Sequence, residues 1–265
     1  MIRKIDYHMH PIGDDPGMEK YLKLMDKYNV THGVIHGLIL DTMGYVGNGG
    51  NEGVAKAVKA HKDRFFGTVC VNFLDGNDKV LDEIKKYGDL GFIGIKLFPN
   101  LGFSPNDEKY EPIFAELEKR GMICFSHCGW LGPDPGHPER RMASLDGGSP
   151  FHFEVPARRH PKVKFIFAHF GGGATYLETI VLCSRLPNAY ADTCPGWGRW
   201  VFDNNLSGIQ AMPKDRLLYG TDNAGDSYGL DDQWWTKKLT SLGWSYDNIN
   251  QYFWYNSARI LGLFK

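Results

Sequence analysis

The chain has 265 residues, 42% of them hydrophobic, with 30 basic and 31 acidic side chains and a formal net charge of −1. This composition supports a large buried core and excludes a disordered chain. The even charge balance shows none of the excess positive charge expected of a protein that binds nucleic acid or an anionic membrane, and no run approaches the ~18 apolar residues of a membrane span. Five cysteines without a Cys-x-x-Cys pair indicate reduced thiols, so we expect a cytoplasmic protein.

Short apolar runs alternate with helical patterns along the chain. The predicted strands are residues 5–10, 33–38, 66–72, 92–98, 122–128, 164–170, 189–194 and 217–222. The predicted helices are residues 18–28, 51–61, 78–87, 107–120, 153–160, 173–185 and 231–242. Eight strands, one in about every 33 residues, predict an α/β fold: a single (β/α)8 TIM barrel domain over residues 1–265. A doubly wound sheet is the alternative, although no Gly-x-Gly-x-x-Gly follows the first strand.

Histidines and an aspartate end four of the predicted strands. His8 and His10 end the first strand, where the alternation of side chains points both to one face. His127 ends the fifth strand, His169 the sixth and Asp222 the eighth. Active sites of such barrels lie at the carboxyl ends of the strands, so we expect these side chains to converge. Their imidazole and carboxylate groups together predict a divalent metal centre.

Other polar and aromatic residues lie at the same edge of the predicted barrel. Trp130 and Arg141 are in the loop after the fifth strand, and Trp197 and Arg199 follow the seventh. An arginine there could hold a substrate carboxylate through two hydrogen bonds, and a tryptophan could stack on an apolar or ring-shaped body. Surface arginines and packing tryptophans are the alternative interpretation of these four residues.

The chain resembles the amidohydrolase superfamily, in the amidohydrolase-related branch that includes the aminocarboxymuconate-semialdehyde decarboxylase-like proteins. The resemblance covers nearly the whole chain and rests on the strand-end residues together with several segments. These segments are Asp63-Arg64-Phe65-Phe66-Gly67, Gly94-Ile95-Lys96-Leu97-Phe98-Pro99, Ala157-Arg158-Arg159-His160-Pro161, Ala168-His169-Phe170-Gly171-Gly172, Tyr219-Gly220-Thr221-Asp222 and Asn256-Ser257-Ala258-Arg259-Ile260-Leu261-Gly262-Leu263.

The resemblance implies a role for each of the strand-end residues. His8, His10, His127 and Asp222 would bind a divalent metal, most simply Zn²⁺, which lowers the pKa of bound water to ~7. His169 would act beside the metal as a base or polarising group, and Asp222 would also take the proton of the water.

The resemblance leaves the number of ions open, and that number depends on Lys96 near the end of the fourth predicted strand. One ion is favoured, with Lys96 as an uncarboxylated cation near the pocket. The alternative is the arrangement of the dihydroorotase branch, where a carboxylated lysine in a similar segment bridges two metals. His169 would then be available to the second ion.

The expected function is metal-dependent hydrolysis of a C–O or C–N bond in a small, carboxylated or cyclic substrate. Non-oxidative decarboxylation at the same metal, as in a carboxy-lyase of the family, is the alternative, because the ligands do not separate the two reactions. A barrel that binds a metal and a small ligand without turnover is a third interpretation, which the presence of both His169 and Asp222 disfavours. The sequence leaves the substrate and the oligomeric state open, a homo-oligomer included.

Overall fold

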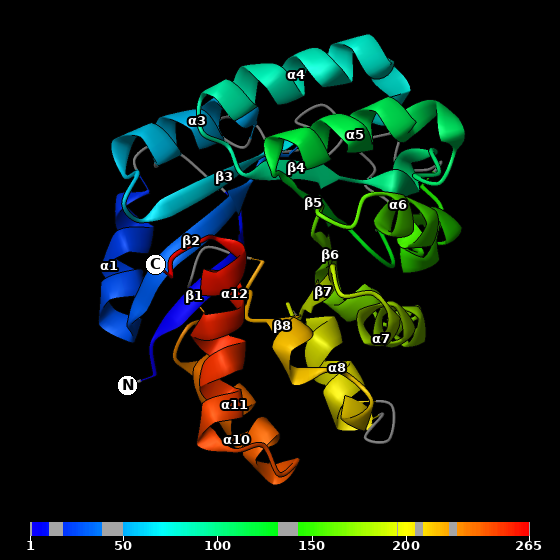
Figure 1. Cartoon of the computed structure of the whole chain (residues 1–265). Coiled ribbons are helices and arrows are strands. Elements are labelled where there is room, and N and C mark those ends of the chain that lie inside the picture. Colours follow the sequence, from blue (N-terminus) through cyan, green and yellow to red (C-terminus); the bar gives the residue numbers. More distant parts are fainter. Residues whose placement is uncertain are drawn as a thin grey trace.

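Eight parallel strands form the centre of the molecule, and helices surround them (Figure 1). This computed structural model describes residues 2–10, 18–38, 50–131, 143–194, 196–204, 209–222 and 227–264, with the side chains of residues 196 and 197 left out. The strands are hydrogen-bonded in the order of the sequence, from the first to the eighth. The TIM barrel predicted from the alternation of strands and helices is confirmed.

The elements follow the predicted order, but the strands predicted at residues 164–170 and 217–222 are much shorter in the structure. The strands are β1 (Lys4–Met9), β2 (Val30–His36), β3 (Phe65–Cys70), β4 (Gly94–Leu97), β5 (Ile123–Ser126), β6 (Phe165–Phe167), β7 (Ala189–Asp192) and β8 (Leu217–Leu218). The α-helices are α1 (Glu19–Tyr28), α3 (Asn51–Ala60), α4 (Asn77–Asp89), α5 (Glu111–Arg120), α6 (Glu154–Arg159), α7 (Tyr176–Arg185), α8 (Gly196–Asn204), α10 (Leu230–Ser241), α11 (Tyr246–Asn250) and α12 (Asn256–Ile260). A π-helical turn, η9 (Gln251–Tyr255), joins α11 to α12. The sequence pattern did not predict α8, α11 or α12.

Backbone hydrogen bonds connect β1 to the segment directly after β8 and so bring the two ends of the sheet together. The Tyr7 amide donates to the Tyr219 carbonyl oxygen at 2.9 Å, and the Asp222 amide donates to the His8 carbonyl oxygen at 2.7 Å. Both bonds use residues that follow β8, which ends at Leu218. The seam of the barrel therefore joins two of the predicted metal ligands through their backbones.

A buried carboxylate, Asp6, reinforces this seam. Its two oxygens accept hydrogen bonds from the Thr221 amide at 3.0 Å, the Thr221 hydroxyl at 2.6 Å, the Tyr228 hydroxyl at 2.7 Å and the His8 amide at 3.2 Å. Burial raises the pKa of Asp6 to about 7, and the hydrogen bonds from Thr221 and Tyr228 oppose that rise. Asp6 thus ties β1 to the segment that carries Asp222.

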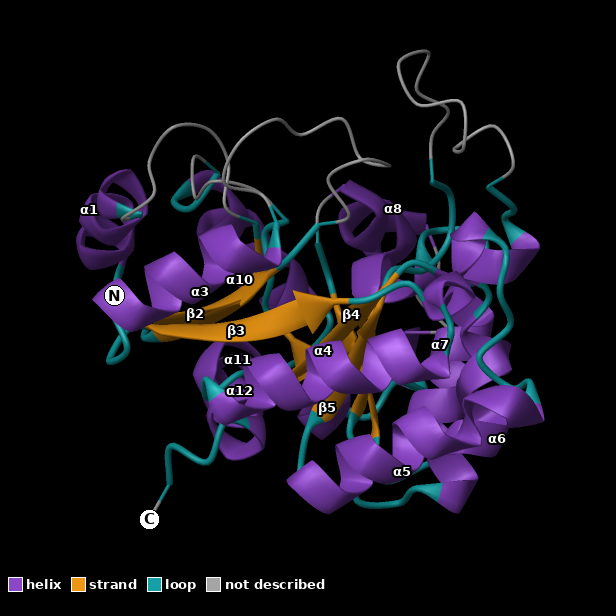
Figure 2. Cartoon of the chain, turned by 90° about the horizontal axis from the view of Figure 1, so that it is seen from above, coloured by secondary structure: helices purple, strands orange, loops and turns teal. Residues whose placement is uncertain are grey.

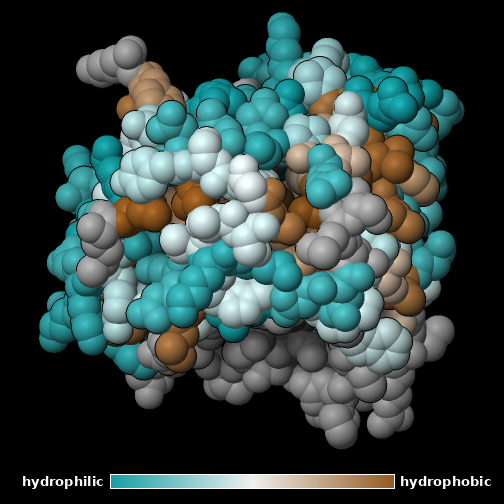
Figure 3. All heavy atoms as spheres, turned by 90° about the horizontal axis from the view of Figure 1, so that it is seen from below, coloured by the Kyte–Doolittle hydropathy of each residue, from teal (hydrophilic) through white to brown (hydrophobic). Residues whose placement is uncertain are grey.

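The apolar core has two layers, one inside the barrel and one between the strands and helices. Tyr7, Phe125, Ile166 and Leu218 belong to the inner cluster. The larger outer cluster packs the strands against the surrounding helices, which enclose them in the view of Figure 2. Figure 3 shows one face of the molecule, where hydrophilic side chains predominate and apolar ones emerge between them, as on an ordinary protein surface. Within the described ranges, no helix has both the length and the apolar character needed to cross a membrane.

Candidate metal centre

His8, His10 and Asp222 meet at the carboxyl end of the barrel. The His8 Nε2 and His10 Nε2 atoms are 3.1 Å apart, and Asp222 Oδ1 lies 3.2 Å from the former and 3.1 Å from the latter. A tetrahedral zinc ion with bonds of about 2.0–2.1 Å would place its ligand atoms roughly 3.3–3.4 Å apart. The three atoms, which we call the ligand trio, therefore have nearly the spacing of ligands around one ion.

The β1 backbone contributes to this convergence. The register between β1 and β2 shifts between Asp6 and Met9, so β1 has one more residue than β2 over this stretch. Such a bulge re-aims side chains and is common next to active sites. Here it lies at Tyr7 and His8, directly before the end of the strand.

The hydrogen bonds behind the two histidines support a cation at the trio. His10 Nδ1 lies 2.9 Å from the His36 carbonyl oxygen and must donate to it, which leaves a lone pair on Nε2. His8 Nδ1 lies 2.9 Å from Asp192 Oδ2, and burial lowers the pKa of His8 well below its usual value. Two Nε2 lone pairs and a carboxylate oxygen facing one another repel without a proton or cation between them. The residues present therefore fit a divalent metal.

Asp222 belongs to the trio through Oδ1, and its side chain also reaches solvent. Its side chain is 24% exposed, and its Oδ2 lies 3.8 Å from His169 Nδ1. Burial opposes ionisation, but the nearby His8, His10 and His169 hold the pKa of Asp222 well below its ordinary value. Its backbone has a φ of 56°, a left-handed conformation that costs free energy in a residue other than glycine. The chain thus holds an ionised carboxylate at the mouth of the barrel.

His169 and His127 form a second pair of imidazoles beside the trio. His169 Nε2 lies 3.0 Å from His127 Nδ1, and His169 Nδ1 lies 2.9 Å from the Cys194 carbonyl oxygen. His127 Nε2 lies 3.3 Å from the Trp130 carbonyl oxygen. Among the described residues, His127 does not join either group of ligand atoms that lie within 4.8 Å of one another. The structure brings His127 to His169, and its binding to the same ion as His8 stays a prediction.

Lys96 is buried against two aromatic rings and the trio. Its Nζ lies 4.4 Å from the centre of the Phe125 ring, 5.0 Å from that of Phe98 and 3.4 Å from His8 Nε2. Burial lowers the pKa of Lys96, while the charges of Asp222 and Asp192 oppose that change. The aromatic faces offer a cation an attractive surface. Burial disfavours the charge of Lys96 and the aromatic faces favour it, so the uncarboxylated cation stays a prediction.

The sequence did not predict a role at the site for two residues, Asp192 and Cys194. They lie at the end of β7 and form, with His8 and His169, a second group of possible ligand atoms within 4.8 Å of one another. Cys194 Sγ lies 2.9 Å from both His8 Nδ1 and Asp192 Oδ1. The available signal was their position, because the seventh predicted strand ends at the same edge as the other ligands.

The predicted substrate-binding residues are only partly placed. Arg141 and the Trp197 side chain lie outside the described residues. Arg199 forms an ion pair with Asp231 and lies over the Trp234 ring. The Trp130 side chain is 57% exposed, while its carbonyl oxygen faces His127. The structure thus leaves the proposed carboxylate clamp and stacking surface as predictions.

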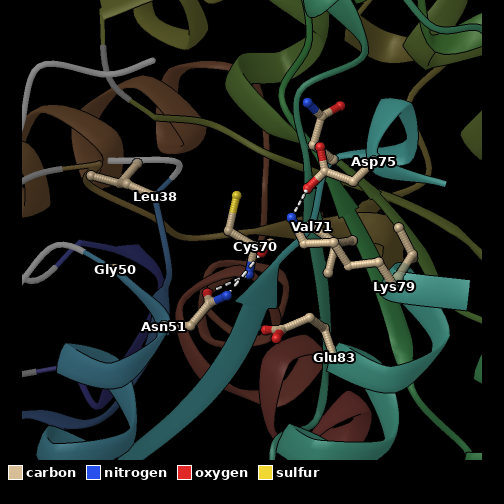
Figure 4. A pocket seen from close by; sticks show the side chains of 10 residues that line it. Leu38, Gly50, Asn51, Cys70, Val71, Asp75, Lys79 and Glu83 are labelled. Atoms are coloured by element: carbon tan, nitrogen blue, oxygen red, sulfur yellow. Dashed lines mark hydrogen bonds and ion pairs between the residues drawn. The ribbon is translucent and has the colours of Figure 1, made fainter. Parts of the chain in front are cut away.

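A cavity of about 340 Å³ opens at the carboxyl end of β3 (Figure 4). Its lining residues include Leu38, Cys70, Asp75 and Glu83. Cys70 pairs in the sheet with Lys96, so the cavity lies next to the strand that carries this lysine. The Asn51 side chain makes two hydrogen bonds to the backbone of Cys70, at 2.7 and 2.9 Å, and fixes this end of β3. The volume is that of a small-molecule pocket.

Comparison with known proteins now identifies the family. Residues 5–263 match the model of the amidohydrolase family. The chain belongs to this family. The resemblance found in the sequence is confirmed, and the chain is an amidohydrolase-family enzyme. No curated protein matches it in sequence.

Solved structures similar to this amidohydrolase chain share its barrel. One is a TIM-barrel protein from Bordetella bronchiseptica, with 17% identity, a TM-score of 0.69 and coverage of 98% of this chain and 99% of that one. Another is 2,6-dihydroxybenzoate decarboxylase from Rhizobium, with 16% identity, a TM-score of 0.67 and coverage of 99% of both chains. A third is dihydroxybenzoic acid decarboxylase from Polaromonas, solved with manganese and 2-nitroresorcinol; it has 14% identity, a TM-score of 0.69 and coverage of 99% and 98%. At these identities the similarity establishes the fold.

Proposed function

We propose that this amidohydrolase-family chain is a metal-dependent hydrolase that cleaves a C–O or C–N bond of a small, carboxylated or cyclic substrate. The observation that carries the proposal is the placement of Asp222. One of its oxygens belongs to the ligand trio, and its side chain is 24% exposed at the barrel mouth. An ionised carboxylate in that position can accept a proton from an attacking water molecule.

The residues proposed to hold the metal are His8, His10, His127 and Asp222. One Zn²⁺ ion is the favoured occupant, since neutral imidazoles and a carboxylate oxygen are its usual protein ligands. A bound divalent ion would supply Lewis-acid chemistry, polarising a substrate oxygen and lowering the pKa of water. The near-tetrahedral spacing of the trio supports one ion at this position.

The proton transfers are proposed for Asp222 and His169. Asp222 Oδ2 would take the proton of the water, and His169 would polarise the substrate or deliver a proton to the leaving group. Asp222 Oδ2 and His169 Nδ1 lie 3.8 Å apart, which supports their acting on one bound substrate, and the His169 ring would then turn away from the Cys194 carbonyl oxygen, 2.9 Å from the same nitrogen. Arg141, Arg199, Trp130 and Trp197 remain the candidates for substrate binding.

Non-oxidative decarboxylation is the second candidate, supported by the similar solved structures. Two of those described above are decarboxylases of dihydroxybenzoic acids, and they cover nearly all of this chain. In that reaction the same metal would chelate substrate oxygens, and His169 or Asp222 would supply the proton that replaces carbon dioxide. All five cysteines lie in the described part of the chain as buried thiols, which supports the reducing cytoplasm as the compartment for either reaction.

A substrate screen in labelled water separates the two reactions. Lactones, amides and aromatic carboxylates would be incubated with the zinc-loaded protein in ¹⁸O water, and carbon dioxide would be measured in parallel. Hydrolysis places one ¹⁸O atom in the product without carbon dioxide release, whereas decarboxylation releases carbon dioxide without ¹⁸O in the organic product. Release of carbon dioxide as the main outcome would replace the hydrolase proposal with the second candidate.

A further inference from the structure

We infer that Asp192 is a positioning residue of the proposed metal centre, orienting the proposed ligand His8 and holding the proposed catalytic residue His169 beside it. This inference rests on the proposed function. Asp192 ends β7 and is fully buried. Its Oδ2 lies 2.9 Å from His8 Nδ1. Its Oδ1 accepts hydrogen bonds from the backbone amides of His169 at 2.9 Å and Cys194 at 3.1 Å.

The contact between Asp192 and His8 determines which nitrogen of the His8 ring carries the proton and which one directs a free lone pair at His10 and Asp222. A carboxylate can only accept, so the proton of a neutral His8 ring lies on Nδ1, directed at Asp192. Nε2 is then free of hydrogen and points at His10 Nε2 and Asp222 Oδ1. A carboxylate behind a metal-binding imidazole also raises the basicity of that ligand.

The contact with His169 stabilises an unfavourable backbone conformation. His169 has a φ of 60° and Phe170 a φ of 50°, both left-handed. Such residues persist only where surrounding contacts hold them. The hydrogen bond from the His169 amide to Asp192 Oδ1 is one of these contacts, and it lies at the point where β6 ends. One carboxylate therefore orients both a ligand of the trio and the proposed catalytic histidine.

The same contacts argue that Asp192 and Cys194 support one metal rather than bind a second. His169 Nδ1 is used by the Cys194 carbonyl oxygen, and Asp192 Oδ1 is used by two backbone amides. The Cys194 thiol is itself a donor to Asp192 Oδ1 at 2.9 Å. With these groups already paired, Asp192, Cys194 and His169 form a hydrogen-bonded support behind the trio.

Asp192→Asn is the decisive variant because it keeps the shape of the side chain. The Asn oxygen can still accept the amides of His169 and Cys194, while its NH₂ group would face His8 Nδ1. His8 would then move its proton to Nε2, directly into the trio, and zinc would have to displace it. We expect zinc affinity, measured by competition with a chromophoric chelator, to fall about 10–100-fold. The melting temperature of the metal-free protein should change little.

Asp203→Asn, at an exposed ion pair with Lys238, is the control and should keep the zinc affinity of the wild type, whereas Cys194→Ser tests whether Cys194 is itself a ligand. The serine hydroxyl can still donate to Asp192, so zinc affinity should stay close to that of the wild type. Loss of zinc affinity in Cys194→Ser, together with loss of a thiolate-to-metal absorption band from the cobalt-loaded protein, would show that Cys194 is a ligand. That result would overturn the supporting role assigned to this group.

A measurement on the unmodified zinc-loaded protein keeps the inference testable if Asp192→Asn does not fold. Nitrogen NMR of His8 should show a protonated Nδ1 and a metal-bound Nε2. Zinc on Nδ1, or unchanged zinc affinity in a folded Asp192→Asn protein, would overturn the inference and leave the proposed function intact. A wild-type protein without zinc affinity would instead overturn the proposed function first.

Discussion

Asp222 is joined to His8 twice, through the backbone and through the side chain. Its amide donates to the His8 carbonyl oxygen at 2.7 Å, and its Oδ1 lies 3.2 Å from His8 Nε2. The two residues belong to opposite ends of the barrel sheet. The distance between two proposed ligands is therefore determined by the closure of the barrel, which a buried carboxylate, Asp6, reinforces.

Asp222→Asn should remove turnover with only a modest change in stability. Asparagine tolerates the left-handed conformation that Asp222 adopts, so the backbone cost of the substitution is small. It cannot take a proton from water, and we expect turnover to fall on the order of 10²–10⁴-fold. Activity and thermal unfolding would be measured together. Asp203→Asn, at an exposed ion pair with Lys238, is the control and should keep full activity. Retained turnover in Asp222→Asn would refute the proposed mechanism.

Elemental analysis should find about one zinc ion per chain, and a chelator should abolish activity. Lys96→Met keeps a long apolar side chain against Phe98 and Phe125, so the metal content of this variant should equal that of the wild type. Activity of the wild type should also be independent of added bicarbonate. Two ions per chain, or loss of metal in Lys96→Met, would instead indicate a carboxylated Lys96.

Gly172→Ala should destabilise the protein more than Gly121→Ala, although both glycines have nearly the same left-handed φ, 69° and 66°. A Cβ atom at Gly121 meets open space, so the cost there is the conformational one, roughly 1–2 kcal/mol. A Cβ atom at Gly172 meets the backbone of Gly129 and Cys128, which adds about 1–3 kcal/mol of overpacking. Unfolding in urea would measure both variants.

The two glycines in contact also matter for the site. Gly129 follows His127 and Gly172 follows His169, so separating their backbones should pull the two imidazoles apart. Gly172→Ala should therefore lower activity at temperatures where the protein is still folded. Equal stability of the two alanine variants would show that the contact between these loops relaxes freely.

Tyr228→Phe should weaken the seam of the barrel. Above pH 7, where Asp6 is ionised, the Tyr228 hydroxyl donates to its buried carboxylate at 2.7 Å, and hydrogen bonds to charged groups contribute about 1.5–3 kcal/mol. We expect a loss of that size in the free energy of unfolding. Tyr246→Phe removes a hydroxyl from a side chain that is 68% exposed and should change stability by less than about 0.5 kcal/mol. Identical unfolding curves for the two variants would contradict a structural role for Asp6.

The sequence could predict the barrel because its strands are near-continuous apolar runs, but it overestimated their length. The run at residues 164–170 is apolar throughout except for its lysine and histidine, whereas β6 ends at Phe167. The strand stops because His169 and Phe170 adopt left-handed backbone conformations, which no pattern of hydrophobicity reports. β8 is likewise shorter than predicted, since the segment after Leu218 turns toward Asp6 and His8.

The candidate site was predictable where residue type and strand end coincide, as for His8, His10 and Asp222. Asp192 shares that position, but none of the segments that resemble the family contains it. Its importance follows from contacts with His8 and His169, which come from other strands and require the three-dimensional fold. The sequence also could not show that Arg199 forms an ion pair with Asp231.

The hydrogen bond between His8 and Asp222 also determines when the proposed metal site can form during synthesis of the chain. A growing chain exposes His8 and His10 early, but two imidazoles alone are a weak zinc site. The carboxylate that completes the trio follows the eighth strand in the chain, and it reaches His8 only when the end of the sheet meets the first strand. If the trio holds the proposed divalent ion, binding of that ion and closure of the barrel would be coupled, and the ion would stabilise the closed fold.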